Sequence, residues 1–170
     1  MRLSEDNVKA AFTDTYINLW GSVVPPFFLK GDCMRILGID YGDARMGVAV
    51  SDPTGVLAGG LCCAKVNGIG SAVKEASRLA EEAKAELIVV GLPVNMNGSE
   101  GERAARVKRF AAELTEACGV ETVFIDERRS TILAAGYMNE TGTHGKKRKE
   151  NIDTLSAQII LQTYLDRTRK

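Results

Sequence analysis

The chain has 170 residues, 45% of them apolar and 26% charged, and its 22 basic and 22 acidic residues cancel to a net charge of zero at pH 7. This composition is typical of an ordinary globular protein, and the length suits one domain with its own core. The balanced charge excludes a strong positive field over the whole molecule, so nucleic acid would have to be held by local groups of basic residues.

The cysteines argue against a structural metal site or a disulfide framework. They lie at positions 33, 62, 63 and 118 without a C-x-x-C pair, and His144 is the only histidine. We therefore expect a reducing compartment, the cytoplasm, and Cys62 and Cys63 are predicted to be small apolar fillers of a strand. No run approaches the roughly 20 apolar residues of a membrane span, so no membrane partner is expected.

Residues 1–33 differ from the rest of the chain. They contain the only tryptophan, Trp20, and three of the five phenylalanines, and they show no regular apolar period. Acids at positions 5, 6 and 14 interrupt the apolar stretch that a signal peptide would need. We predict a poorly ordered extension over 1–33 and a folded domain over 34–170.

The first half of that domain predicts a meander of strands followed by a helix and a buried strand. Apolar runs at 36–39, 46–50 and 56–66 are separated by Gly42 and by the turn 52–55, which favours three antiparallel strands. Residues 69–84 repeat apolar side chains at three and four, as in an amphipathic helix. Residues 86–92 are continuously apolar after an initial glutamate, which is typical of a central strand in a helix-covered parallel sheet.

The second half alternates helices with one more strand. Ser99 is predicted to cap a helix over 100–117, a strand follows at 121–125, and a helix at 131–138 precedes a Gly- and Lys-rich loop at 141–149. A final amphipathic helix is predicted over 152–165. The order β-β-β-α-β-α-β-α-α indicates an α/β fold with a mixed five-stranded sheet flanked by helices.

Acidic residues stand at the ends of several predicted elements. Asp40 ends the first strand, Asp126 and Glu127 follow the fifth, and Asp153 begins the last helix. Each has an ordinary explanation, because Asp40 could form the turn before Gly42 and the others could stabilise helix N-termini. Only their combination indicates a functional site.

Four motifs between residue 34 and about residue 167 resemble the YqgF/RuvX family in order and spacing. They are Gly38-Ile-Asp-Tyr-Gly42 with Arg45-Met-Gly-Val-Ala-Val-Ser-Asp52, the loop from Gly91 to Gly101, Asp126-Glu-Arg128, and Ile152-Asp153 with Ile159-Ile-Leu-Gln162. Members of this family are RNase H-like proteins, described as Holliday junction resolvases and as nucleases that mature the 5′ end of pre-16S ribosomal RNA.

The resemblance implies an RNase H-like fold whose first strand lies beside the fourth, with the fifth beyond it. Asp40 and Asp126 would then face one crevice at the carboxyl edge of the sheet. By the same resemblance Asp40, Asp126 and Asp153 are the expected ligands of Mg²⁺ or Mn²⁺, with Glu127 as the alternative to Asp126. Successive strand residues point to opposite faces, so only one member of that pair should line the site.

Basic residues form a second group of candidates. Between residues 101 and 149 there are ten basic and seven acidic residues, although the whole chain is neutral. The residues expected to contact phosphate, which fixes position without reading sequence, are Arg45, Arg103, Arg106, Arg128, Lys146 and Lys147. The alternative for Lys146 and Lys147 is a simple solvated loop.

The resemblance implies a hydrolase, a metal-dependent endonuclease acting in ribosome biogenesis as a monomer or weak homodimer. Its substrate would be structured nucleic acid, an rRNA precursor rather than four-way junction DNA. Two other classes of function are alternatives: a non-catalytic binding module, and a sugar-kinase-like ATPase, which shares the opening Gly38–Gly42 but needs two such domains. The sequence shows no aromatic platform on which unpaired bases could stack, so it does not decide between RNA and DNA as the substrate.

Overall fold

The structure, a computed structural model, describes residues 16–17, 23–24, 34–94, 101–126 and 146–169, with the side chains of 16–17, 23–24 and 146–150 left out of that description. The chain divides into two compact units, Met1–Asp32 and Cys33–Lys170. In the first unit β1 (Tyr16–Ile17) and β2 (Val23–Val24) form a short antiparallel ladder. Most of the predicted N-terminal extension lies outside the described residues.

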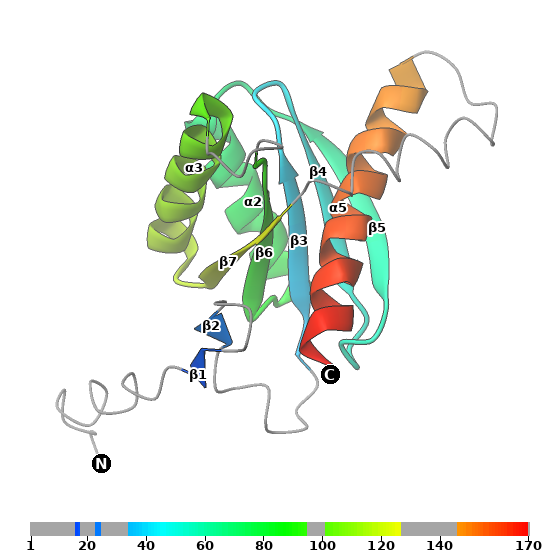
Figure 1. Ribbon diagram of the computed structural model, residues 1–170. Coiled ribbons are helices and arrows are strands. Elements are labelled where there is room, and N and C mark those ends of the chain that lie inside the picture. Colours follow the sequence, from blue (N-terminus) through cyan, green and yellow to red (C-terminus); the bar gives the residue numbers. More distant parts are fainter. Residues whose placement is uncertain (1–15, 18–22, 25–33, 95–100, 127–145, 170) are drawn as a thin grey trace, which may run out of the picture. The chain divides into compact units, whose positions relative to one another are not determined.

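The second unit is built on a mixed five-stranded sheet, as predicted (Figure 1). In spatial order the strands are β5 (Ala58–Lys65), β4 (Arg45–Ser51), β3 (Ile36–Tyr41), β6 (Leu87–Leu92) and β7 (Glu121–Asp126). The first three pair antiparallel, and β3, β6 and β7 pair parallel. The first strand of the domain thus lies beside the fourth, with the fifth beyond it.

One face of the sheet is covered by α2 (Ile69–Ala83) and α3 (Glu102–Cys118). Their apolar side chains recur at helical spacing and pack with alternate residues of the central strands, such as Ile39 and Val90, in one buried cluster. Lys84 and Gly119, both with positive φ, end these helices. The predicted apolar pattern of α2 is therefore confirmed, and so is the presence of a helix at α3.

The other face is covered by α5 (Lys146–Thr168), the long helix in orange and red in Figure 1. Its backbone lies very close to the sheet, because the strands carry glycines beneath it. A Cβ atom on Gly38 would lie 3.0 Å from the backbone oxygen of Ala157, and one on Gly47 would lie 1.9 Å from that of Asp153. The helix that carries Asp153 can therefore dock only where the sheet has no side chain.

Two predicted boundaries are wrong. The loop expected over 141–149 contains the start of α5 at Lys146, because Lys, Arg and Glu are good helix formers and the helix continues into them from the packed part. Helix α3 begins at Glu102 after Gly101, with no side-chain cap, so Ser99 is not its capping residue. The predicted helix at 131–138 lies outside the described residues. Of the helices in the described ranges, none has the length and apolar character of a membrane span.

Candidate active site

The site begins with a row of three residues across the antiparallel half of the sheet. Asp40 of β3 pairs with Gly47 of β4, and Gly47 pairs on its other side with Cys63 of β5. Cross-strand partners share a face of the sheet, with Cβ atoms about 5 Å apart. Because Gly47 faces α5, Asp40 and Cys63 flank the place where α5 touches the sheet.

Asp153 of α5 lies directly over Gly47, the middle member of this row. Its backbone occupies the space that a Cβ atom of Gly47 would fill, so the two chains are in contact there. Asp40 is therefore about one strand spacing from Asp153, although 112 residues separate them in the chain. The structure brings these two predicted acids together on one face.

The carboxylate of Asp153 is held by two side chains from the sheet. Arg45 Nε donates a hydrogen bond to Asp153 Oδ2 at 2.6 Å, and Cys63 Sγ donates to the same oxygen at 3.6 Å. The side chains of Arg45 and Asp153 are 37% and 25% exposed, so the pair is partly shielded from solvent. Both of these contacts go to Oδ2 of Asp153.

The strand end beside Asp40 is anchored from the opposite face. Tyr41 stacks on Phe110 of α3, with ring centroids 4.5 Å apart, and burial raises the pKa of its phenol. Gly42 donates from its backbone nitrogen to the oxygen of Arg45 at 3.0 Å, which closes the tight turn between β3 and β4. These contacts fix Asp40 and Arg45 relative to each other.

Asp126 ends β7, and two strand spacings, or about 10 Å, separate β3 from β7. Thr122, four residues earlier, shares a hydrogen bond of 2.9 Å with Thr115 of α3. Strand alternation therefore directs Asp126 towards the α3 face, whereas Asp40 is on the α5 face. Glu127, the predicted alternative to Asp126, lies outside the described residues.

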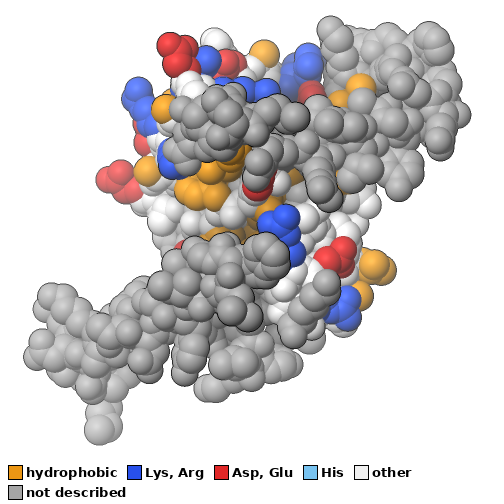
Figure 2. All heavy atoms as spheres, in the orientation of Figure 1, with side chains coloured by type: hydrophobic (Ala, Val, Ile, Leu, Met, Phe, Trp, Pro, Cys, Tyr) orange, Lys and Arg blue, Asp and Glu red, His pale blue; other side chains and the backbone are white. Residues whose placement is uncertain are grey.

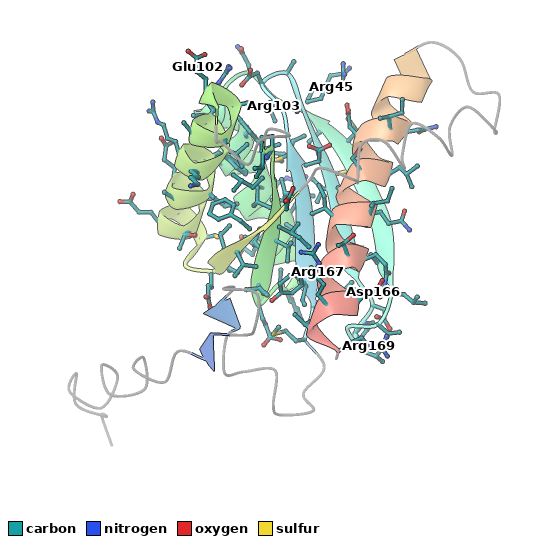
Figure 3. The ribbon with its side chains drawn as sticks, viewed as in Figure 1. Arg45, Glu102, Arg103, Asp166, Arg167 and Arg169 are labelled. Carbon is teal, nitrogen blue, oxygen red and sulfur yellow. The ribbon has the colours of Figure 1, made fainter. Side chains whose placement is uncertain are left out.

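The basic candidates gather at the end of the domain that carries the turn between β3 and β4. Figure 3 shows Arg45 and Arg103 at this end and Arg167 and Arg169 at the opposite end, and Figure 2 shows Lys and Arg side chains along the same upper edge. Arg106 Nη1 donates to Asp43 Oδ2 at 2.8 Å, which ties α3 to the turn.

Three further basic candidates are not placed by the structure. Arg128 lies outside the described residues, and so do the side chains of Lys146 and Lys147. Their predicted contact with phosphate stays a prediction. Their backbone positions at the start of α5 nonetheless put Lys146 and Lys147 within two helical turns of Asp153.

The described acids are carboxylates, which a hard divalent cation prefers, but there are too few of them close together to surround it. Within the described ranges, no three His, Cys, Asp or Glu side chains are grouped closely enough to hold a metal ion. Two carboxylates are nevertheless enough for Mg²⁺, which keeps several water molecules and takes further oxygens from a substrate phosphate. Asp40 and Asp153 are the two described acids that lie on the α5 face of the sheet beside Gly47.

Sequence reasoning missed three residues of the site. Cys62 packs against the core as expected of a filler, but Cys63 points the other way and contacts Asp153. Lys65, the cross-strand partner of Arg45, adds a positive charge beside it. Gly47 was visible in the sequence, but only the docking of α5 shows why a side chain is excluded there.

Comparisons with known proteins show what the chain is similar to. The model of the RuvX family, described as Holliday junction resolvase, matches residues 34–167. A protein of Ruminiclostridium cellulolyticum named "Putative pre-16S rRNA nuclease" is 44% identical over 79% of this chain and 95% of its own length. One of the same name from Clostridium kluyveri is 39% identical over 81% of this chain and 100% of its own length.

Two solved structures share the fold at low sequence identity. The Thermus thermophilus RuvC complex with a Holliday junction substrate has a TM-score of 0.51 at 14% identity, covering 79% of this chain and 95% of that one. The Fowlpox virus resolvase complex with Holliday junction DNA has a TM-score of 0.53 at 10% identity, covering 81% of this chain and 100% of that one. On the match over residues 34–167 and the identity to its relatives, this chain belongs to the RuvX family.

Proposed function

We propose that this chain is a metal-dependent endonuclease that hydrolyses phosphodiester bonds of structured nucleic acid, and that it matures the 5′ end of pre-16S ribosomal RNA in the cytoplasm. Membership of the RuvX family supports the reaction, and the names of the relatives support the substrate. Holliday junction DNA is the alternative substrate, after the description of the family.

The observation that carries the proposal is the position of Asp153 over Gly47, next to Asp40. Nothing in an ordinary globular core requires two carboxylates on adjacent elements at a partly exposed sheet edge, because their mutual repulsion is unfavourable. The contact of Arg45 with Asp153 offsets part of that repulsion. A divalent cation would offset the rest.

Asp40 and Asp153 would hold the cation, and Glu127, the predicted alternative to Asp126, would complete its ligands, because Asp126 is directed to the α3 face. Mg²⁺, or Mn²⁺ in its place, activates a water molecule and neutralises charge on the leaving oxygen when it is bound between carboxylates. Arg45 orients the carboxylate of Asp153 through Nε and contributes positive charge where a phosphate would lie. Lys65 beside it and Arg103 on α3 would position the neighbouring phosphates.

Cleavage of a pre-16S rRNA fragment that includes the mature 5′ end tests the proposal. We expect the wild-type chain to cut the fragment with Mg²⁺ or Mn²⁺ and not with EDTA, and Asp40→Asn to lower the rate by at least about a hundredfold. The matched control is Asp166→Asn, the same change at the opposite end of the domain (Figure 3).

Two results would count against the proposal. Equal cleavage by wild type and Asp40→Asn would assign the activity to a contaminant. Tight binding of the fragment without cleavage by any of the variants would identify a non-catalytic binding module. Preferential cutting of a four-way DNA junction would support the proposed reaction but identify junction DNA, not rRNA, as the substrate.

A further inference from the structure

A groove of about 520 Å³ lies between the edge strand β5 and the N-terminal half of α5. Cavities of about 300–1,000 Å³ are the usual size for a small organic ligand. From β5 it is lined by Leu61, Cys62 and Cys63, and from α5 by Asn151, Thr154, Leu155 and Gln158. Cys63 and Thr154 connect it to the proposed site, because Cys63 contacts the carboxylate of Asp153 and Thr154 is the next residue of the helix.

The lining of the groove differs in charge from the site beside it. None of the described residues that line it is charged, whereas Arg45 and Lys65 lie side by side at the adjacent end of β4 and β5. A phosphate would be bound by cationic side chains or by free backbone N–H groups, so the cationic end suits phosphate and the groove does not. A neutral part of the substrate strand suits the groove.

The groove offers apolar contact together with neutral hydrogen-bonding groups. Leu61 is 45% exposed, which is unusual for a large apolar residue of a strand, and Leu155 lies opposite on the helix. Asn151 is exposed, and Gln158 donates from Nε2 to the backbone oxygen of Ala58 at 2.9 Å, with its Oε1 3.5 Å from the place that a Cβ atom of Gly60 would take. Amides of this kind pair with base edges, and aliphatic side chains pack on base faces.

We propose that this groove binds an unpaired nucleobase of the substrate strand, next to the phosphate that is cleaved. A base stacked and paired inside a duplex cannot reach it, so the enzyme would select single-stranded segments, bulges or junction points where a base is already unstacked. The inference rests on the proposed function for the position of the cleaved phosphate, but the groove itself is tested by binding alone.

The test compares two strands of equal charge in EDTA, where no cleavage occurs. One is a single-stranded uridine decanucleotide, and the other is a strand of ten abasic nucleotides. We expect the wild-type chain to bind the strand with bases about tenfold more tightly, because a packed base contributes at about this level. Fluorescence anisotropy at fixed low salt measures both dissociation constants.

Variants then locate the base-dependent part of the affinity. In the Leu61→Ala, Asn151→Ala double variant the preference for the strand with bases should fall below about twofold, with the abasic strand bound as by wild type. Leu57→Ala is the matched control, because Leu57 is 64% exposed just before β5 and does not line the groove. It should keep the tenfold preference.

Either of two outcomes overturns the inference: equal affinity of wild type for the two strands, including no measurable binding of either, or a preference that survives in the double variant. Failure of the proposed function gives a different result, since a chain that cuts no RNA would still show the base-dependent preference. Conversely, a chain that cuts RNA but binds both strands equally would refute the inference about the groove and leave the proposed function standing.

Discussion

The guanidinium of Arg45 occupies one oxygen of a carboxylate that the proposed reaction needs for a metal ion. At 2.6 Å it lowers the negative potential of Asp153, and it would repel a cation bound to the same group. Both side chains are partly exposed, so solvent reduces the effect. In the proposed function Arg45 would therefore be a positioning residue that keeps Asp153 in place before a metal ion binds.

We expect Arg45→Gln to tighten Mn²⁺ binding in the absence of substrate by about fivefold, because one positive charge is removed beside the ligand. Titration calorimetry or the spin-resonance signal of free Mn²⁺ measures this directly. Arg45→Lys, which keeps the charge, is the control and should bind Mn²⁺ as wild type does. Unchanged or weaker binding by Arg45→Gln would show that Arg45 does not compete with the cation.

Asp52 gives the turn between β4 and β5 a pH dependence. A hydrogen bond from the Thr54 hydroxyl, with others from the backbone N–H groups of Leu57 and Val56, lowers the pKa of Asp52 from 3.8 to about 2. A carboxyl whose pKa is depressed by folding stabilises the native state above its unfolded pKa, and this contribution is lost as pH falls through the folded value.

The stability difference between wild type and Asp52→Asn should therefore be full above about pH 4 and disappear towards pH 2. Urea denaturation at a series of pH values measures it. Thr54→Val removes the hydrogen bond that contributes most to the lowered pKa of Asp52. In that variant the stability difference should therefore disappear over a narrower pH range. A difference that stays constant from pH 5 to pH 2 would contradict the assignment.

At the scale of the elements, the docking of α5 on a glycine decides whether a site exists. A Cβ atom at Gly47 would overlap the backbone of Asp153, and neither backbone can move without separating the helix from β4. We expect Gly47→Ala to destabilise the domain by more than the 1–3 kcal/mol of ordinary overpacking, measured by urea denaturation.

Gly70→Ala is the matched control for that substitution. Gly70 lies in the first turn of α2 with nothing within 4 Å of an added Cβ atom, so alanine should stabilise the domain by about 0.4–1 kcal/mol. Opposite signs for the two changes are the expected result. Equal and small effects would mean that α5 does not rest on Gly47 as described.

The elements that sequence predicted well are those whose residues pack in the core. The apolar period of α2 and α3 and the continuous apolar run of β6 follow directly from burial on one face or on both, so their existence could be read from the chain. The start of α5 at Lys146 could not, because its charged first turn has no apolar period and resembles a solvated loop.

The site could be predicted only in part. Asp40 and Asp153 could be proposed from motifs, but a sequence does not say which face of a strand an acid occupies, because a shift of one residue reverses it. The pairing of β6 with β7 decides that Asp126 is directed to the α3 face. Contacts between distant elements, such as Cys63 with Asp153, leave no local pattern at all.

For the whole molecule, the zero net charge means that nucleic acid would be attracted by local groups of basic residues, of which Figure 3 shows Arg45 and Arg103 at one end of the domain. If Arg45, Lys65 and Arg103 each neutralise a phosphate of a single strand, the logarithm of the binding constant should fall with the logarithm of salt with a slope of about −2. Arg103→Ala should reduce that slope by about 0.7, and Arg167→Ala, at the opposite end, should leave it unchanged. Equal effects of the two variants would place the strand elsewhere.

The most direct test of the whole account is an anomalous difference map from a crystal of the full chain soaked in Mn²⁺. We predict a peak about 2.0–2.3 Å from carboxylate oxygens of both Asp40 and Asp153, with Glu127 rather than Asp126 as a further ligand. A Mn²⁺ peak elsewhere with none between these two residues, or carboxylates of Asp40 and Asp153 too far apart to share one ion, would contradict it.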